Sequence, residues 1–155
     1  MKTLLNIIWH IPFLGFLWAL VDAIIGCIWC ITIVGLPIGL GLLQFSKFLL
    51  SPFSRAMVNQ SDVHTMKQTE QNQLWKGFSL IVRILYFPIG LLGALSALGT
   101  IVVEFISILG IPCGIVWAKS LSTIFNPVNK VCVSRNVYEE IEKVKKEKEI
   151  AQFKK

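Results

Sequence analysis

The sequence predicts an all-α membrane protein made of two copies of one helical hairpin. Hydrophobic residues make up 54% of its 155 residues. Residues 3–46 include a single charged side chain, Asp22, and residues 84–118 include only Glu104. Uncharged stretches longer than about 18 residues are typical of transmembrane helices. A short motif also occurs twice in register, which indicates a duplicated structural unit.

The repeated motif has the pattern Gly-x-Pro-x-Gly and follows a long apolar run in both places. Residues 35–39 read Gly-Leu-Pro-Ile-Gly, and residues 110–114, seventy-five positions later, read Gly-Ile-Pro-Cys-Gly. A second proline, Pro52 or Pro127, and then a basic residue follow each motif at matching distances. Each copy is therefore expected to be a long helix, a turn and a shorter helix. The turn residues are Gly35, Pro37, Gly39, Gly110, Pro112 and Gly114.

The second helix of each copy is predicted to be short. The glycine ends the preceding helix, and the proline suits the first turn of the next, where no amide hydrogen is needed. The second helices are expected over 37–58 and 112–133, with a kink or an end at Pro52 and Pro127. About 14 residues precede each of these prolines, giving about 21 Å of helix against a hydrocarbon core of about 30 Å. Two topologies stay open: a full crossing with a kink, or a shorter, tilted or re-entrant helix.

The first helix of each copy is too long for one upright crossing. A helix over residues 3–34 would be about 48 Å long at 1.5 Å per residue. We expect an interfacial segment to Ile11, a break at Pro12 and a span over about 13–34. The second copy is expected to repeat this plan, with a break at Pro88.

The basic residues predict the orientation. Lys2, the segment 55–83 and the tail from Lys130 are basic, whereas both Gly-Pro turns are uncharged. Bases collect on the cytoplasmic side of a membrane, so the N-terminus, the middle segment and the C-terminus are predicted to be cytoplasmic. The two copies are then expected to be parallel repeats, related by an axis along the membrane normal.

Four regions follow from this pattern. Residues 1–58 and 74–133 are predicted to form the two membrane hairpins. Residues 59–73 are polar and are expected to form a cytoplasmic linker. Residues 134–155 alternate Glu and Lys around a short apolar stripe, which is typical of a solvated amphipathic helix. The C-terminal region is therefore predicted to be a charged cytosolic helix.

Four ionisable residues in or near the apolar helices are candidates for intramembrane polar or pore-lining groups. Such residues are unfavourable in lipid and often mark a substrate or ion pathway. Asp22 lies well inside the first span, which suggests ion passage, proton exchange or pairing with a lysine; the alternative is a structural hydrogen bond between helices. Lys47 and Lys119 suggest pairing or extension toward the head groups. Glu104 suggests a carboxylate close to the outer interface.

No enzyme, cofactor or nucleic-acid site is expected. The chain has no nucleophile elbow and no phosphate-binding loop. Cys27 and Cys30 lie within an apolar stretch without a second ligand pair, so we expect no metal there. A nucleic-acid surface would need a basic face on a soluble domain, so membrane lipid is the expected partner. A strip of small residues favours close helix packing and a homo-oligomer: Gly90, Gly93, Ala94 and Ala97.

The paired motifs resemble the YccF family of bacterial inner-membrane proteins, which carry this inner membrane component domain in tandem. The resemblance runs from about Leu4 to Val133. The family often has glycine two places after the second proline, where this chain has Ser54 and Asn129. The resemblance implies a multi-pass protein of the bacterial inner membrane and no general activity. In the second copy the residues that match the family pattern are Gly110, Pro112, Gly114, Lys119 and Pro127.

Two classes of function remain open from the sequence. The first is a channel or translocation pathway for ions or small solutes, formed by assembly, with Asp22, Glu104 or Lys119 near its lining. The second is a non-transporting scaffold or regulatory protein that binds an unidentified membrane or cytosolic protein through its charged tail. The first predicts that neutralising Asp22 alters conductance, and the second that deleting residues 136–155 removes the effect.

Overall fold

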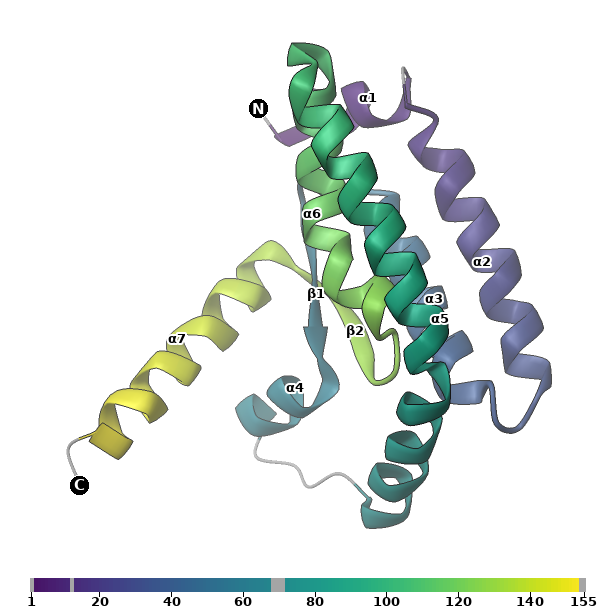
Figure 1. The fold of residues 1–155 in the computed structure, drawn as a ribbon. Coiled ribbons are helices and arrows are strands. Elements are labelled where there is room, and N and C mark those ends of the chain that lie inside the picture. Colours follow the sequence, from purple (N-terminus) through teal and green to yellow (C-terminus); the bar gives the residue numbers. More distant parts are fainter. Residues whose placement is uncertain (1, 12, 68–71, 154–155) are drawn as a thin grey trace.

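The computed structural model describes residues 2–11, 13–67 and 72–153, and most of them are helical (Figure 1). The high helical content agrees with the predicted all-α class, although two short strands are also present. The elements of the first half are α1 (Lys2–His10), α2 (Gly15–Ile31), α3 (Leu36–Leu49), β1 (Arg55–Asn59) and α4 (Gln60–Lys67). Those of the second half are α5 (Gln73–Ile106), a 3-10 turn η1 (Ile108–Gly110), α6 (Ile111–Phe125), β2 (Lys130–Ser134) and α7 (Arg135–Phe153).

The sequence repeat is a structural repeat. Helices α2 and α3 pack as one hairpin, and α5 and α6 pack as another. Pro37 and Pro112 both lie in the first turn of the second helix of their hairpin, as predicted. The strands β1 and β2, at 55–59 and 130–134, are also seventy-five positions apart. The duplicated unit therefore consists of a helical hairpin followed by a strand.

The two strands join the copies into a single structure. They pair antiparallel, with Met57 opposite Cys132 and Arg55 opposite Ser134. Met57 and Cys132 are equivalent residues of the repeat, so a local two-fold axis passes between them, perpendicular to the strands. The predicted second helices over 37–58 and 112–133 are therefore too long. Helix α3 ends at Leu49 and α6 at Phe125, because the chain turns at the fully buried Pro52 and Pro127 and continues as a strand.

The two hairpins run in opposite directions. Figure 1 shows α2 descending to the turn before α3, whereas α5 ascends to the turn before α6. The prediction of parallel repeats with one orientation does not agree with this arrangement. The physical reason is the antiparallel pairing of β1 with β2, which turns the second copy over relative to the first. The orientation was predicted from the positions of the basic residues, which contain no information about the pairing of the strands.

The first helical segment is bent in one copy and straight in the other. Helices α1 and α2 meet at 75°, and Leu14 at the junction has a left-handed backbone with φ of 52°. The bend agrees with the predicted break between the first segment and the following helix, although Pro12 itself lies outside the described residues. The predicted break at Pro88 is wrong, because α5 continues through that proline as one helix of 34 residues.

A buried tryptophan explains the difference between the copies. Trp9 is 1% exposed, and its indole Nε1 donates a hydrogen bond of 2.8 Å to the Leu49 carbonyl oxygen. Its ring lies directly over Gly15, where a side chain would collide with it. The equivalent residue in the second copy is Ile84, which is 67% exposed. Only the first copy therefore has a side chain that holds the bend closed.

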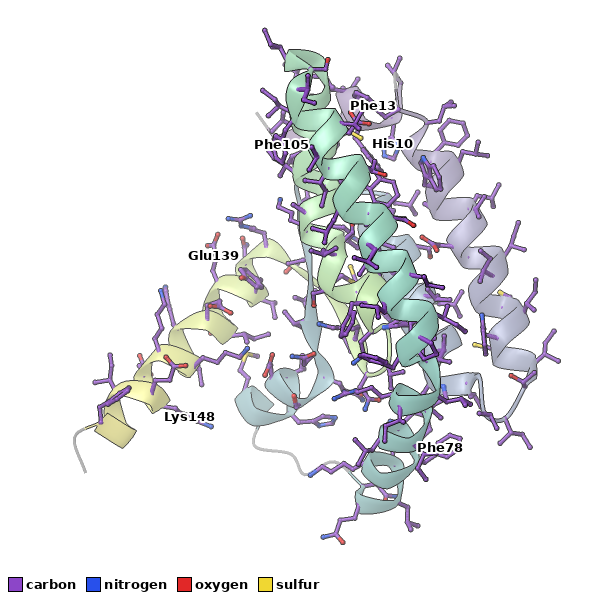
Figure 2. All side chains as sticks on the ribbon, in the orientation of Figure 1. His10, Phe13, Phe78, Phe105, Glu139 and Lys148 are labelled. Carbon is purple, nitrogen blue, oxygen red and sulfur yellow. The ribbon has the colours of Figure 1, made fainter. Side chains whose placement is uncertain are left out.

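The outward faces of the hairpins are apolar and uncovered. Helix α5 contains an 18-residue stretch of mean hydropathy 2.1, of which 17% is buried. In the described residues, α5 is long and apolar enough to cross a bilayer, and the bent pair of α1 and α2 counts as a second span if taken together. Figure 2 labels Phe78 and Phe105 on α5, and Glu139 and Lys148 on the charged helix α7. Apolar faces of this extent are typical of membrane or protein interaction surfaces.

The polar elements gather on the other side of the strands. Helix α7 is amphipathic, as predicted, and its Ile141 is 2% exposed. Its Lys145 forms an ion pair of 2.7 Å with Asp62. Asp62 lies in α4, which occupies part of the predicted linker 59–73. The rest of that segment includes residues 68–71, which lie outside the described residues.

We expect Lys145→Gln to loosen α7 without unfolding the protein. Partly exposed ion pairs contribute about 0.2–1 kcal/mol and weaken in salt. Hydrogen-deuterium exchange at neutral pH should show faster exchange in α7 of this variant, and Lys148→Gln, which removes an exposed lysine, should behave as wild type. Hydrogen bonding to Asp62 raises the pKa of Lys145 above its usual value. The contribution is therefore complete at neutral pH and is lost as the pH rises above about 10.5. Equal exchange in both variants would contradict the role of this ion pair.

Candidate functional site

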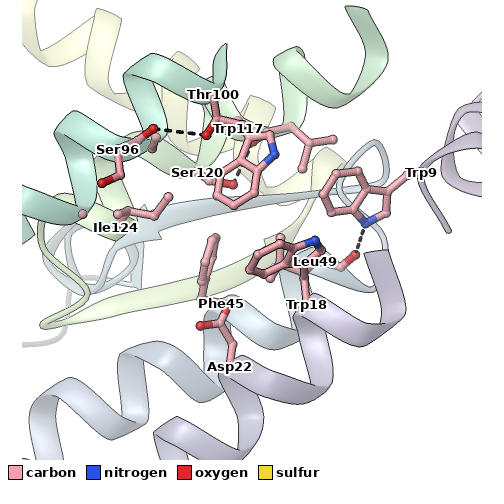
Figure 3. A pocket seen from close by; sticks show the side chains of 13 residues that line it. Trp9, Trp18, Asp22, Phe45, Leu49, Ser96, Thr100, Trp117, Ser120 and Ile124 are labelled. Carbon is pink, nitrogen blue, oxygen red and sulfur yellow. Dashed lines mark hydrogen bonds between the residues drawn. The ribbon is translucent and has the colours of Figure 1, made fainter. Parts of the chain in front are cut away.

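A groove lies between the two hairpins and encloses about 390 Å³ (Figure 3). Both copies contribute to its walls, and Figure 3 shows their side chains facing one another across it. The first copy contributes Trp9, Trp18, Asp22, Phe45 and Leu49. The second copy contributes Gly93, Ser96, Ala97, Thr100, Val116, Trp117, Ser120 and Ile124.

Equivalent residues of the two copies meet in this groove. Four pairs of lining residues are seventy-five positions apart, and in each pair the first copy has the larger side chain or one of similar size. The groove therefore lies where the repeat symmetry brings the same positions of both hairpins together, and at three of these four positions a larger side chain of the first copy is matched by a smaller one of the second. The pairs are Trp18 with Gly93, Asp22 with Ala97, Phe45 with Ser120 and Leu49 with Ile124.

Asp22 is the charged residue of the groove. Its side chain projects from α2 toward Phe45, with Trp18 to one side, in Figure 3, and the residue is partly exposed. No basic side chain is among the groove residues. In the part of the chain that the structure describes, the ion pairs join Arg135 to Glu139 and Lys145 to Asp62, so none involves Asp22. The groove therefore has a net negative charge when Asp22 is ionised.

Aromatic rings form much of the surface near this carboxylate. Trp18 and Trp117, one from each copy, pack edge to face with ring centroids 5.5 Å apart and planes at 81°. Trp9 is fixed by its hydrogen bond to Leu49. Edge-to-face packing leaves the electron-rich face of one ring uncovered by the other, so the groove offers aromatic surface as well as a carboxylate.

Two hydroxyl groups on the opposite wall are held as acceptors. Ser120 Oγ donates a hydrogen bond of 2.7 Å to the Val116 carbonyl oxygen. Thr100 Oγ1 donates one of 3.1 Å to the Ser96 carbonyl oxygen. A hydroxyl has one donor and two acceptor lone pairs, so the partly exposed Thr100 can still accept a hydrogen bond from a molecule in the groove, whereas Ser120 is 1% exposed. Like Asp22, Thr100 favours a positively charged or hydrogen-bond-donating ligand.

The other predicted ionisable residues lie elsewhere. Glu104 lies near the turn between α5 and α6. Its carboxylate Oε2 would be 2.5 Å from the Cβ of any residue that replaced Gly110. Lys47 is exposed near the end of α3. Lys119 donates to the Pro52 carbonyl oxygen at 3.5 Å and lies 5.0 Å from the centre of the Phe53 ring. The structure brings none of the three to Asp22, so the predicted pairing of Asp22 with a lysine is not formed.

The glycines of the repeat turns serve helix packing. A side chain at Gly39 would lie 2.5 Å from the Gly26 carbonyl oxygen, and one at Gly35 would lie 2.5 Å from the Trp29 carbonyl oxygen. These glycines therefore let α3 approach α2 closely.

Cys27 and Cys30 are free thiols. The described residues contain no group of three His, Cys, Asp or Glu side chains placed to hold a metal ion.

A second, polar pocket of about 400 Å³ lies beside the strands. Lys76 and Arg83 of α5 contribute its positive charge. Asn129 also lines it, with a left-handed backbone of φ 58°, and its side-chain oxygen accepts a hydrogen bond of 3.0 Å from Trp75 Nε1. Asparagine adopts this conformation more readily than most residues. It can therefore take the place of the glycine that the resembled family often has here.

The fold defines a helical protein built from two copies of a hairpin and a strand, in which α5 is long and apolar enough to cross a membrane. Residues 4–55 match the family model described as YccF, inner membrane component domain. The match confirms the predicted resemblance to the YccF family and covers the first copy, from α1 to the start of β1. No curated protein and no solved structure matches the chain.

Proposed function

We propose that the protein is a translocation pathway for cations, with the groove between the hairpins as its binding site. The observation that carries the proposal is Asp22, a carboxylate without a basic partner in the described residues, at the interface of the two repeats. Ionisable residues in membrane segments are unfavourable unless they serve a pathway or a partner. Substrate sites of many transporters lie at the interface between internal repeats.

We also propose how the protein lies in the bacterial inner membrane. The apolar faces of α2 and α5 are in lipid or in contact with further copies of the chain, which supports a multi-pass homo-oligomer. The strands, α4 and α7 carry many of the bases and lie on the cytoplasmic side. The pocket with Lys76 and Arg83 suits the anionic head groups of lipids at that surface.

Cation flux into proteoliposomes tests the proposal. We expect wild-type protein to conduct cations and Asp22→Asn, which keeps the shape and removes the charge, to reduce that flux at least tenfold, the effect of losing about 1.4 kcal/mol of interaction. Glu104→Gln is the matched control, since it neutralises a carboxylate outside the groove, and it should conduct as wild type. Wild-type flux in the Asp22→Asn variant would overturn the proposal.

A non-transporting interaction protein is the second candidate. The observation that favours it is α7, a helix whose outer face is charged and uncovered beyond its contact with α4. A chain ending at residue 146 keeps Ile141 and the Lys145 ion pair, and it removes only the exposed end of the tail. Loss of a cellular phenotype in this variant, with no flux from wild-type protein, would support the interaction role instead.

A further inference from the structure

We infer that the groove binds a hydrophobic organic monocation, such as a quaternary ammonium or phosphonium ion. This inference rests on the proposed function, because it names the class of cation that the pathway takes. It is carried by the combination of one carboxylate, several aromatic rings and few oxygen ligands in one groove between the repeats.

The size of the groove suits an organic molecule. Pockets for small organic ligands enclose about 300–1,000 Å³ and are mostly apolar, with a few placed polar groups. The groove encloses about 390 Å³, and its walls are largely tryptophan, phenylalanine and aliphatic side chains. The molecule would lie between α2 of the first copy and α5 and α6 of the second.

The chemistry of the walls disfavours a bare inorganic ion. Small metal cations require about six oxygen ligands to replace their water. The groove offers one carboxylate and the accessible acceptor sites of Thr100 and Ser96 among apolar walls. A cation surrounded by carbon loses much less hydration on entry and gains attraction from aromatic faces, at about 0.5–2 kcal/mol for each contact. Trp18 and Trp117 supply such surface next to Asp22.

The asymmetry of the repeats sets the charge of the ligand. The first copy has Asp22, and the equivalent position of the second copy has Ala97, which is 3% exposed. A symmetric groove would hold two carboxylates and favour two positive charges. One carboxylate is neutralised by one positive charge, so the groove fits a monocation.

An acyl chain of a lipid is the competing occupant. A mostly apolar groove that opens toward the membrane would accept such a chain. However, a lipid chain gains nothing from Asp22, and it leaves the carboxylate without a counter-charge. The sign of the ligand charge therefore separates the two occupants.

Binding of tetraphenylphosphonium to the purified full-length protein in detergent tests the inference, with tryptophan fluorescence and calorimetry as readouts. Tetraphenylborate has nearly the same shape and the opposite charge, so it is the matched control ligand. We expect tetraphenylphosphonium to bind and tetraphenylborate neither to bind nor to compete. Equal binding of the two ions, or binding of neither, would overturn the inference, and equal binding would indicate an apolar site for lipid chains.

Variants locate the binding. Asp22→Asn and Trp18→Ala should each weaken tetraphenylphosphonium binding at least tenfold, whereas Glu104→Gln should leave it unchanged. The double variant Asp22→Ala with Ala97→Asp moves the carboxylate to the equivalent position across the groove and should restore binding lost in Asp22→Ala. Asp22→Glu, which keeps the charge on the original helix, provides the same test if the double variant does not fold. Unchanged binding in Asp22→Asn would overturn the inference.

Flux measurements on the same preparations separate this inference from the proposed function. Binding of tetraphenylphosphonium without flux of any cation would overturn translocation and leave the organic-cation site standing. Flux of potassium or protons that depends on Asp22, without binding of tetraphenylphosphonium, would overturn the organic-cation site and leave translocation standing.

Discussion

Replacing Gly41 with alanine is expected to prevent the two copies from packing together. Gly41 lies in the middle of α3 against the turn at Pro127, and a side chain there would collide with the Pro127 carbonyl oxygen and lie 2.6 Å from its carbonyl carbon. These are backbone atoms of a fully buried proline, so no rotation of a side chain relieves the collision. Overpacking costs typically 1–3 kcal/mol and sometimes more. We expect the upper end of that range or beyond, and a large fraction of aggregated protein.

Thermal unfolding in detergent, followed by size-exclusion chromatography, measures the effect of the Gly41→Ala substitution. Gly99→Ala and Gly77→Ala are matched controls in α5, because nothing lies within 4 Å of a side chain built at either glycine. Alanine in an open helix position is more favourable than glycine by up to about 1 kcal/mol. The controls should therefore unfold at the same temperature as wild type or slightly above. A Gly41→Ala variant that unfolds with them would show that α3 and the Pro127 turn do not pack this closely.

Replacing Trp9 with alanine should destabilise the protein by about 3–5 kcal/mol, the range found for buried aromatic residues. Trp9 is 1% exposed, and its core cluster includes Phe45 and Phe48 of α3 and Val116 of α6. The substitution also removes the hydrogen bond to the Leu49 carbonyl oxygen, which closes the bend between α1 and α2. The loss should therefore appear both in the unfolding temperature and in faster amide exchange throughout α1.

The equivalent residue of the other copy provides the control for Trp9. Ile84→Ala shortens a side chain that is 67% exposed, and it should shift the unfolding temperature very little in detergent. Trp9→Phe keeps most of the ring and loses the hydrogen bond. Its destabilisation, about 1–3 kcal/mol, should therefore lie between those of Ile84→Ala and Trp9→Ala. If Trp9→Ala and Ile84→Ala unfold alike, the bend is not held by the tryptophan.

Much of the helical architecture was predictable because it depends on local signals. Long uncharged runs and a Gly-x-Pro turn predict both ends of α2 and the start of α3 to within a few residues, whereas the predicted end of α3 at residue 58 is nine residues too late. The repeat at a spacing of seventy-five transfers the same plan to α5 and α6. The break at Pro88 failed as a prediction because a proline only permits a bend, and the bend in the first copy depends on Trp9, which the second copy lacks.

The strands depend on a partner far along the chain and were not predicted. Most of each strand, residues 55–58 and 130–133, falls at the end of a predicted second helix, because a strand of five residues gives too short a pattern to stand out from a helix. The alternating valines at 131 and 133 are the local signal that favours a strand there. The prediction that the two copies have the same orientation is wrong for the same reason, because their relative orientation follows from the pairing of these strands.

The acidic residue of the groove was predictable, and its surroundings were not. The sequence predicts Asp22 as a site residue, because an ionisable residue within an apolar helix is unfavourable in lipid and often marks a pathway. The aromatic and hydroxyl residues around it look like ordinary membrane-helix residues in the sequence. An alignment of the two repeats would have identified some of these residues. It pairs Trp18 with Gly93 and Phe45 with Ser120, so that a large residue of the first copy is aligned with a small residue of the second.

The pairing of β1 with β2 also sets the order in which the fold is completed during synthesis. Seventy residues separate Asn59 from Lys130, so the first strand leaves the ribosome long before its partner exists. Until β2 is made, the backbone donors and acceptors of β1 that later pair with it form an open edge, which invites pairing with another chain. The first hairpin is therefore incomplete by itself, and the fold is complete only when the second strand reaches the first.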